Sequence, residues 1–286
     1  MDGFATTGAA FEYWFFNFRA GALSILIDFI VRRGPSSDGV EIRVSRWVRG
    51  IGTVERSVDP WREDPVAVVG SAAGTFKREG SVGNVGACNW DLSWKLGDRR
   101  LDPRPRVFGP FHPADLELIT FPAARFDGWV TVGDERFDVS ASPGAITHYW
   151  GRRLPDRWTW ISATEFPGRP GRRVEALEAW SRTWGRGPSL PIGYLWTTDG
   201  LRDDLTISPV TGLIRVQRDR PAGGADLSIS MSSLRLGGKS HRLHVYAPES
   251  VFNDLGEGIR QTLLADLTFD GLPAAPSSVG LELRIG

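Results

Sequence analysis

A histidine set among aromatic residues is the feature of this sequence most suited to chemistry. His148 lies in the run Thr147–Gly151 (THYWG), and a second aromatic run, Trp158–Ser162 (WTWIS), follows it. Side chains alternate between the faces of a strand, so His148 and Trp150 share one face and Tyr149 points to the other. An imidazole exchanges protons near neutral pH, and beside an indole it would do so in an apolar pocket. The same residues could instead form a well-packed corner of a barrel, with His148 as a hydrogen-bonded structural residue.

Glu12 is a second candidate for proton transfer. It shares a strand face with Trp14, Phe16 and Phe18 in the run Phe11–Phe18 (FEYWFFNF). Burial on so apolar a face raises the pKa of a carboxyl, which would make Glu12 a proton donor near neutral pH. The alternative interpretation is that Glu12 opens the strand and pairs with one of the chain's many arginines.

Further residues could complete a site of this kind. Glu165 is a candidate acid on a neighbouring predicted strand. Indole faces stabilise positive charge through their quadrupole, which suits the cyclisation or hydration of polyenes. The aromatic residues expected to contact a substrate are Trp14, Trp150, Trp158, Trp160 and Tyr149.

Metal, nucleotide and covalent sites are not indicated. The histidines are His112, His148, His241 and His244, and none belongs to a CxxC, HExxH or clustered carboxylate pattern. His241 and His244 have an odd spacing and should face opposite sides of a strand. No glycine-rich loop joins a strand to a helix, and Cys88 has no histidine nearby in sequence to activate it. We therefore expect acid–base chemistry without a metal or cofactor.

Composition limits the partners and the compartment. The 286 residues include 34 basic and 34 acidic side chains, a balance that argues against nucleic-acid binding. One cysteine allows no intramolecular disulfide. The apolar run 22–31 is interrupted by Asp28 and is too short to span a bilayer. We expect a cytoplasmic protein that binds a hydrophobic small molecule, with transient membrane-surface contact possible and the oligomeric state left open.

Short strands separated by turns dominate the pattern, which predicts an all-β chain. Phe11–Phe18 and Leu23–Arg32 indicate one hairpin, and the segments 128–132 and 136–140 another. Residues 252–264 are the one plausible helix, with a loop as the alternative. The linker candidate Pro167–Gly171 divides the chain into predicted domains 1–166 and 172–286.

Three of these segments carry a resemblance to a known superfamily. They are the opening Glu12–Phe16 (EYWFF), the hairpin FDGWVTVGDERFDV, and Thr147–Gly151 followed by the Trp-Thr-Trp strand at 158–160. Together they resemble the lipocalin-like double-barrel superfamily, which includes carotenoid 1,2-hydratase, AttH-type proteins, tocopherol cyclase and the lipocalin-like Diels–Alderases. The resemblance covers most of the first 166 residues. It implies two lipocalin-like antiparallel barrels packed together and a site at His148 and Trp150.

One position departs from the superfamily pattern. The acidic residue expected before the histidine is Thr147 here. If that acid supplies the proton in a hydratase, this chain must supply it from elsewhere.

The expected function is therefore a cofactor-independent cyclase, hydratase or isomerase acting on a hydrophobic polyene or isoprenoid-like molecule. Glu12, Glu165 or His148 would move the proton. A non-catalytic carrier of lipid or pigment could use the same cavity. A carbohydrate-binding module is the third alternative, and it would place tryptophans on a flat exposed surface.

Overall fold

The computed structural model describes residues 5–34, 39–61, 67–98, 100–102, 116–152, 154–182, 187–199, 202–208, 212–219, 227–235 and 240–284. Over these residues the chain is almost entirely β-strand, and the only helical segment is a single 3-10 turn at Glu249–Val251. The predicted all-β class is confirmed. Within the same residues, no helix is long and apolar enough to cross a membrane. The chain divides into two compact units whose main boundary lies between Leu154 and Pro155, and the short segment Gly50–Gly52 is grouped with the second unit.

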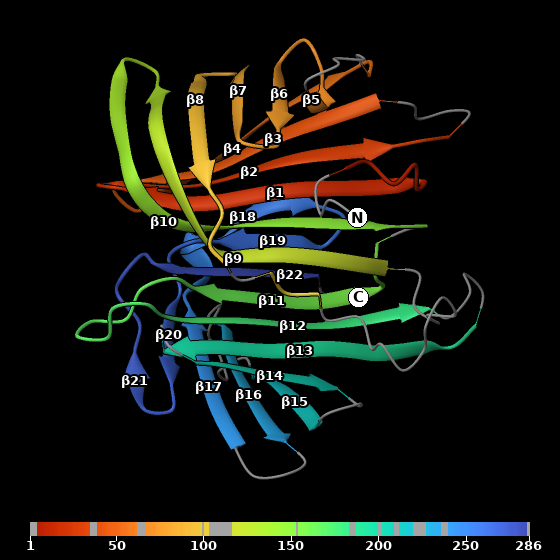
Figure 1. Ribbon diagram of the computed structural model, residues 1–286, viewed down its shortest axis with the longest axis vertical. Coiled ribbons are helices and arrows are strands. Elements are labelled where there is room, and N and C mark those ends of the chain that lie inside the picture. The colour runs from red at the N-terminus through yellow and green to blue at the C-terminus, as the bar shows by residue number, and fades with distance from the viewer. Residues whose placement is uncertain are drawn as a thin grey trace. The chain divides into compact units, whose positions relative to one another are not determined.

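The first unit is built on one ten-stranded antiparallel sheet (Figure 1, red to light green). Its strands are β1 (Phe11–Ala20), β2 (Leu23–Arg32), β3 (Gly39–Val48), β4 (Ile51–Asp59), β5 (Ala67–Gly70), β6 (Gly74–Lys77), β7 (Gly80–Val85), β8 (Cys88–Lys95), β9 (Leu116–Val132) and β10 (Glu135–Gly151). Their order across the sheet is β4-β3-β2-β1-β10-β9-β8-β7-β6-β5. Both predicted hairpins are present, and β1 also pairs with β10, which lies far away in sequence.

Aromatic rings pack against one another across the interior of this sheet. The alternate residues of β1 that face inward are apolar from Trp14 onward, as the strand period requires. Phe16 lies 5.3 Å from Trp94 and 5.8 Å from Phe126, and Phe76 lies 5.2 Å from Trp94, measured between ring centroids. Ring contacts at these distances are the usual offset and edge geometries of an aromatic core. The middle of the first unit is therefore occupied by its own side chains.

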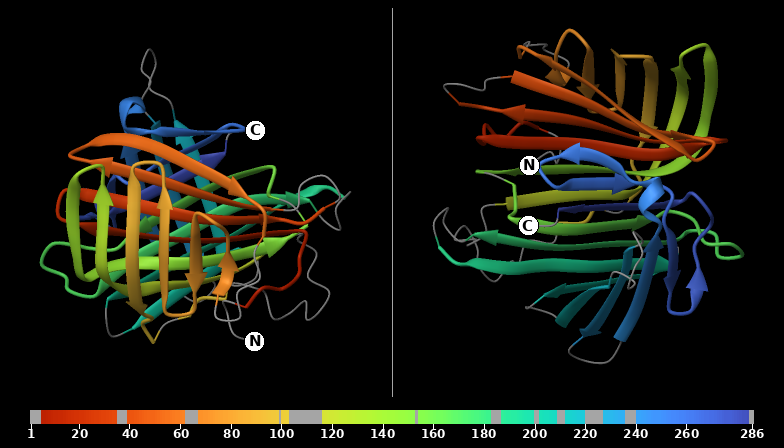
Figure 2. Two further views of the ribbon diagram at one scale, coloured as in Figure 1. Left: turned by 90° about the horizontal axis from the view of Figure 1, so that it is seen from above. Right: turned by 180° about the vertical axis from the view of Figure 1, so that it is seen from behind.

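The second unit contains a seven-stranded and a five-stranded antiparallel sheet (Figure 2). The seven-stranded sheet contains β11 (Arg157–Ala163), β12 (Arg172–Arg182), β13 (Ser189–Asp199), β14 (Asp203–Ser208), β18 (Asn253–Gly256), β19 (Ile259–Thr262) and β22 (Val279–Arg284). The five-stranded sheet contains β15 (Gly212–Asp219), β16 (Leu227–Arg235), β17 (Ser240–Ala247), β20 (Asp266–Phe269) and β21 (Leu272–Pro273). Apolar residues of both sheets form one buried core.

Two segments differ from the sequence-based expectation. The predicted helix at 252–264 is wrong, because the segment forms the hairpin of β18 and β19. Its turn holds Gly256, Glu257 and Gly258 at φ of +81°, +53° and +73°, which no right-handed helix tolerates. Strand β11 was assigned to the first predicted domain, but it pairs with β12 and β22 of the second unit.

Cys88 begins β8 and is buried. Loss of solvation raises the pKa of its thiol to about 12. The thiol is therefore protonated and unreactive in the folded protein at neutral pH.

Candidate functional site

Strand pairing between β1 and β10 brings Glu12 and His148 together. Glu12 lies opposite Trp150, and Trp14 lies opposite His148, so all four share the inward face of the sheet. The imidazole Nε2 of His148 is 3.2 Å from Oε2 of Glu12, although the two residues are 136 positions apart. Both side chains are buried. A carboxylate and an imidazole at this distance form a hydrogen-bonded pair able to hold a proton between them.

Two indole rings flank the imidazole of His148. Trp14 stacks on it with 4.3 Å between centroids and 9° between planes. Trp150 lies 4.7 Å away and is tilted by 37°. Trp14 and His148 are fully buried, whereas Trp150 is only half-buried. Indole faces in these positions would stabilise a positive charge on the imidazole.

The carboxylate of Glu12 has further hydrogen-bond donors. Oε1 accepts from the Thr6 hydroxyl at 2.7 Å, the Gly8 amide at 3.0 Å and an Arg33 guanidinium nitrogen at 2.5 Å. Oε2 accepts from the amide of Thr7 at 2.8 Å. The segment before β1 thus folds over Glu12 and supplies two backbone amides to a single side chain.

These donors reverse the expected titration of Glu12. Burial alone would raise its pKa, as predicted from the apolar strand face. The hydrogen bonds from His148, Thr6 and Thr7 and the positive charge of Arg33 outweigh burial and lower the pKa of Glu12 to about 2. The prediction that Glu12 is a proton donor near neutral pH is therefore wrong. Glu12 is instead a carboxylate paired with Arg33, which agrees with the alternative interpretation of its sequence position.

Arg33 connects this pair to the surface. A guanidinium nitrogen donates to the Ala9 carbonyl at 2.7 Å, and the group lies 5.3 Å from the Trp61 ring centroid. Arg33 and Trp61 are both half-buried. Like Trp150, both residues are therefore partly accessible to solvent.

Thr147 and Tyr149 lie on the opposite face of β10, as the strand period predicts. Thr147 is fully buried, and its hydroxyl hydrogen bonds to that of Thr120 at 2.8 Å. The position at which the resemblance predicts an acid is therefore a neutral threonine that hydrogen bonds to a second threonine and faces away from His148. Tyr149 stacks on Tyr13 with 5.9 Å between centroids.

The remaining predicted residues belong to the second unit. The indole nitrogen of Trp158 donates to Glu282 at 3.0 Å, and Trp160 is buried next to Gly280. Glu165 is half-buried in the turn after β11, where its backbone carbonyl accepts from the Ala275 amide at 2.9 Å. All three residues belong to the second unit, whereas the arrangement around His148 is built by strands of the first unit.

A buried polar cluster on the other face of β1–β3 was not predicted. The Tyr13 hydroxyl donates to Asp28 at 2.8 Å, and an Arg43 guanidinium nitrogen lies 3.9 Å from the same carboxylate. Arg43 also donates to Glu41 at 3.0 Å. The sequence signal was present in Asp28, a charged residue that interrupts an apolar strand. A tyrosine held by a buried carboxylate is a second potential hydrogen-bond donor or acid.

Among the described residues, no group of three histidine, cysteine, aspartate or glutamate side chains could hold a metal ion. His112 lies outside the described residues. His241 and His244 lie on opposite faces of β17, as their spacing predicts: His244 is exposed and His241 is half-buried.

No family model matches the sequence, and no curated protein matches it. Solved structures do resemble the whole chain. An AttH protein from Nitrosomonas europaea superimposes with a TM-score of 0.63 at 13% identity, covering 98% of this chain and 94% of its own. Kievitone hydratase from Nectria haematococca superimposes with a TM-score of 0.63 at 10% identity, and the match covers 100% of this chain and 91% of that protein. CghA superimposes with a TM-score of 0.60 at 11% identity, and the match covers 97% of this chain and 89% of that protein. At these identities the likeness establishes a common fold, which does not by itself assign a function.

Proposed function

From the lipocalin-like double-barrel fold that this chain shares with those structures, we propose that the protein is a cofactor-independent enzyme acting on a hydrophobic polyene or isoprenoid-like molecule. Its reaction would be a hydration, cyclisation or isomerisation that starts with proton transfer to carbon. The observation that carries the proposal is the buried Glu12–His148 pair stacked on Trp14. In this proposal the ligand binds next to Trp150 at the end of the sheet interior, because aromatic rings occupy the middle.

In this proposal His148 is the acid and Glu12 the group that supports it. The imidazolium gives its proton to one carbon of a double bond, and positive charge develops on the adjacent carbon. The positive charge is then removed in one of three ways. Water adds to the carbon in a hydration, a second double bond of the same molecule attacks it in a cyclisation, and a neighbouring proton is lost in an isomerisation. A proton returns to the imidazole in each case. Glu12 stays ionised throughout and stabilises the imidazolium, as the carboxylate of a catalytic triad does.

The nature of the acid narrows the substrate class. An imidazolium is a milder acid than a carboxyl group, so transfer to an isolated double bond would be strongly uphill. A double bond conjugated with an electron-donating phenol or enol oxygen delocalises the developing positive charge and lowers that cost. One of the similar structures is named as a hydratase, which agrees with proton addition to a double bond. We therefore favour conjugated, oxygen-bearing substrates over simple hydrocarbons.

A sugar-binding function is not favoured by the positions of the tryptophans. Trp14, Trp158 and Trp160 are 0%, 6% and 2% exposed. Carbohydrate stacking needs an exposed aromatic face, which these three residues do not present.

Deuterium transfer separates an enzyme from a carrier. The protein would be incubated in D2O with a panel of conjugated polyenes and unsaturated ketones, and each compound recovered for mass spectrometry. The enzyme proposal predicts a product with deuterium bound to carbon, formed by the wild type and lost in His148→Gln. Tryptophan-fluorescence titration should show that the variant still binds the same compound. Binding without deuterium incorporation for every compound that binds would support the carrier and overturn the enzyme.

A further inference from the structure

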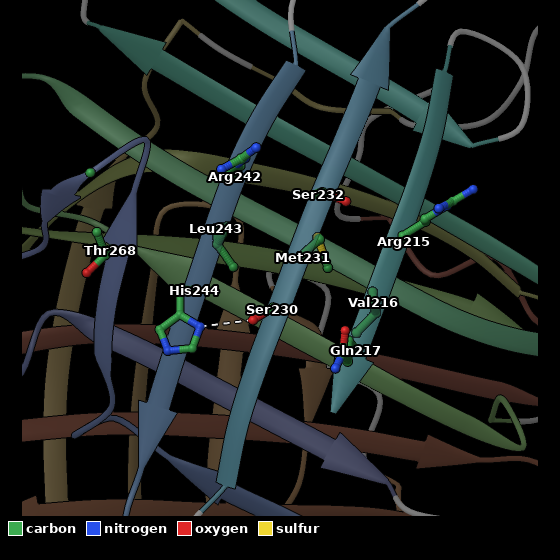
Figure 3. A pocket seen from close by; sticks show the side chains of 11 residues that line it. Arg215, Val216, Gln217, Ser230, Met231, Ser232, Arg242, Leu243, His244 and Thr268 are labelled. Carbon is green, nitrogen blue, oxygen red and sulfur yellow. Dashed lines mark hydrogen bonds between the residues drawn. The ribbon is translucent and has the colours of Figure 1, made fainter. Parts of the chain in front are cut away.

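The solvent-facing side of the five-stranded sheet carries a hollow of about 700 Å³ (Figure 3). Its lining comes mainly from three neighbouring strands, β15, β16 and β17. The residues that line it are Arg215, Val216, Gln217, Ser230, Met231, Ser232, Arg242, Leu243, His244, Thr268 and Gly271. We refer to this hollow as the arginine groove.

Strand alternation shows which side chains face the arginine groove. The three main strands each contribute three successive residues, of which the first and third point to one side of the sheet. Arg215, Ser232 and Arg242 are exposed, whereas the intervening Met231 and Leu243 are each 1% exposed and belong to the core. The arginine groove therefore lies on the outer face of the sheet.

Long polar side chains stand on both sides of a serine strand. Arg215 pairs in register with Ser232, which pairs with Arg242, so a short side chain lies between two arginines. In the adjacent row Ser230 occupies the same place next to His244, whose Nδ1 is 3.0 Å from the serine hydroxyl. Figure 3 shows the serines on the middle strand and the arginines on the strands to either side. The small serines leave the space, and the arginines form its walls.

The positive charge of the two guanidinium groups is not neutralised within the described part of the chain. No ion pair there involves Arg215 or Arg242. The outward-facing carboxylate on β15 is Asp219, four residues beyond Arg215, and it already accepts the Gln217 amide at 3.0 Å. Four residues of strand span about 13 Å, which exceeds the screening length of about 8 Å at physiological salt. The Asp270 carboxylate beside the groove accepts the Arg242 backbone amide at 2.8 Å and lies 2.8 Å from Nδ1 of His241, but it forms no ion pair with either guanidinium group. A ligand in the arginine groove thus meets two guanidinium groups that no described carboxylate pairs with.

We infer that the arginine groove binds a small, soluble molecule carrying a diphosphate or two closely spaced phosphate groups. Arginine presents a planar fork of donors that matches phosphate oxygens. The two arginine strands are separated by one strand, about 10 Å from backbone to backbone. Figure 3 shows the Arg215 side chain directed away from the serine strand, and in the proposed complex it rotates towards that strand so that both guanidinium groups contact one compact polyanion. The hydroxyls of Ser230 and Ser232 are additional donors on the floor. This inference does not depend on the proposed function of the first unit.

The test uses inorganic pyrophosphate as the probe and calorimetric titration of the full chain. Wild type should bind it with a stoichiometry of one, and the variant carrying both Arg215→Gln and Arg242→Gln should bind at least roughly tenfold more weakly, because charge-assisted hydrogen bonds are lost on both walls. The matched control is Arg136→Gln on β10, where an exposed arginine is already paired with Asp138 at 2.9 Å. That control should bind like the wild type.

Three results would overturn the inference. One is the absence of pyrophosphate binding by the wild type. Another is equal weakening in the double variant and the Arg136→Gln control, which would indicate general charge attraction. The third is binding to vesicles of phosphatidic acid with phosphatidylcholine without binding to soluble pyrophosphate, which would make the groove a membrane-contact surface. Circular dichroism of each variant confirms that a loss of binding is not a loss of fold.

Discussion

His148 in the first unit and His241 in the second both hydrogen bond to carboxylates, but the two surroundings differ in charge and in solvent access. His148 is hydrogen-bonded to Glu12, whose charge is shared with Arg33. His241 lies between two carboxylates: its Nδ1 is 2.8 Å from Asp270, and its Nε2 is 3.0 Å from Asp204. The His148 side chain is 1% exposed and that of His241 is 12% exposed.

This difference suits the two histidines to different tasks. His241 has a carboxylate at each ring nitrogen and so links β14 to the turn after β20. The carboxylate hydrogen-bonded to His148 is shared with Arg33. A shared carboxylate suits a group that must release a proton, and a carboxylate at each nitrogen suits a group that ties two segments together. The comparison therefore predicts that His148 matters for turnover and His241 for stability alone.

The largest expected effect is on turnover. His148→Gln should lower the rate of deuterium transfer by about 10²–10⁴-fold, the usual contribution of a general acid. His241→Gln should leave this rate unchanged. Rates are measured in D2O on the compound that the wild type converts. Similar losses in both variants would remove the distinction between the two histidines.

The next effect is on the stability of the first unit. Glu12→Gln keeps the shape of the side chain but leaves Arg33 partly buried without its carboxylate. Breaking a buried ion pair from one side costs about 3–5 kcal/mol, and we expect a decrease of that size in the free energy of unfolding. Denaturant titration with fluorescence detection measures it. A decrease below about 1 kcal/mol, the value of an exposed pair, would show that the donors around Glu12 contribute little.

A related effect appears as a pH dependence. The pKa of Glu12 is lowered from 4.5 to about 2 on folding, so the folded state binds a proton on this group less readily than the unfolded state. The stabilisation is complete above pH 4.5 and is lost as the pH falls from 4.5 towards 2. It amounts to about 3 kcal/mol at 1.36 kcal/mol per pH unit. Unfolding free energies between these limits should decline more steeply in wild type than in Glu12→Gln, and parallel curves would contradict the assignment.

The smallest effect concerns the second unit. Asp204→Asn removes one of two carboxylates from a histidine near the surface, and we expect a loss of about 1 kcal/mol, typical of such pairs. Thermal unfolding of the variant checks this value. A loss as large as that of Glu12→Gln would mean that the two histidine sites do not differ in the way their burial suggests.

The alternation of residues along each strand was sufficient to predict which side chains share a face. The two-residue period placed Glu12 with Trp14, and His148 with Trp150, without knowledge of the fold. The pairing of β1 with β10 could not be derived from that period, because it joins residues 136 positions apart.

The titration of Glu12 shows why the chemistry was harder to predict than the fold. The apolar strand face was identified correctly, and burial does act to raise the pKa. The opposing donors include the backbone amides of Thr7 and Gly8, which any residue type would supply. A hydrogen bond from a backbone amide leaves no signature in composition or spacing, so the sign of the pKa shift depended on the structure.

The burial of Cys88 has a practical consequence for all of these measurements. It is the only thiol in the chain, it lies in the first unit, and it is protonated and shielded while that unit is folded. A thiol-reactive dye at neutral pH can therefore label the protein only when the first unit opens. The labelling rate therefore reports how often the first unit opens. The second unit contains no thiol and does not contribute to the signal, so no engineered probe is needed.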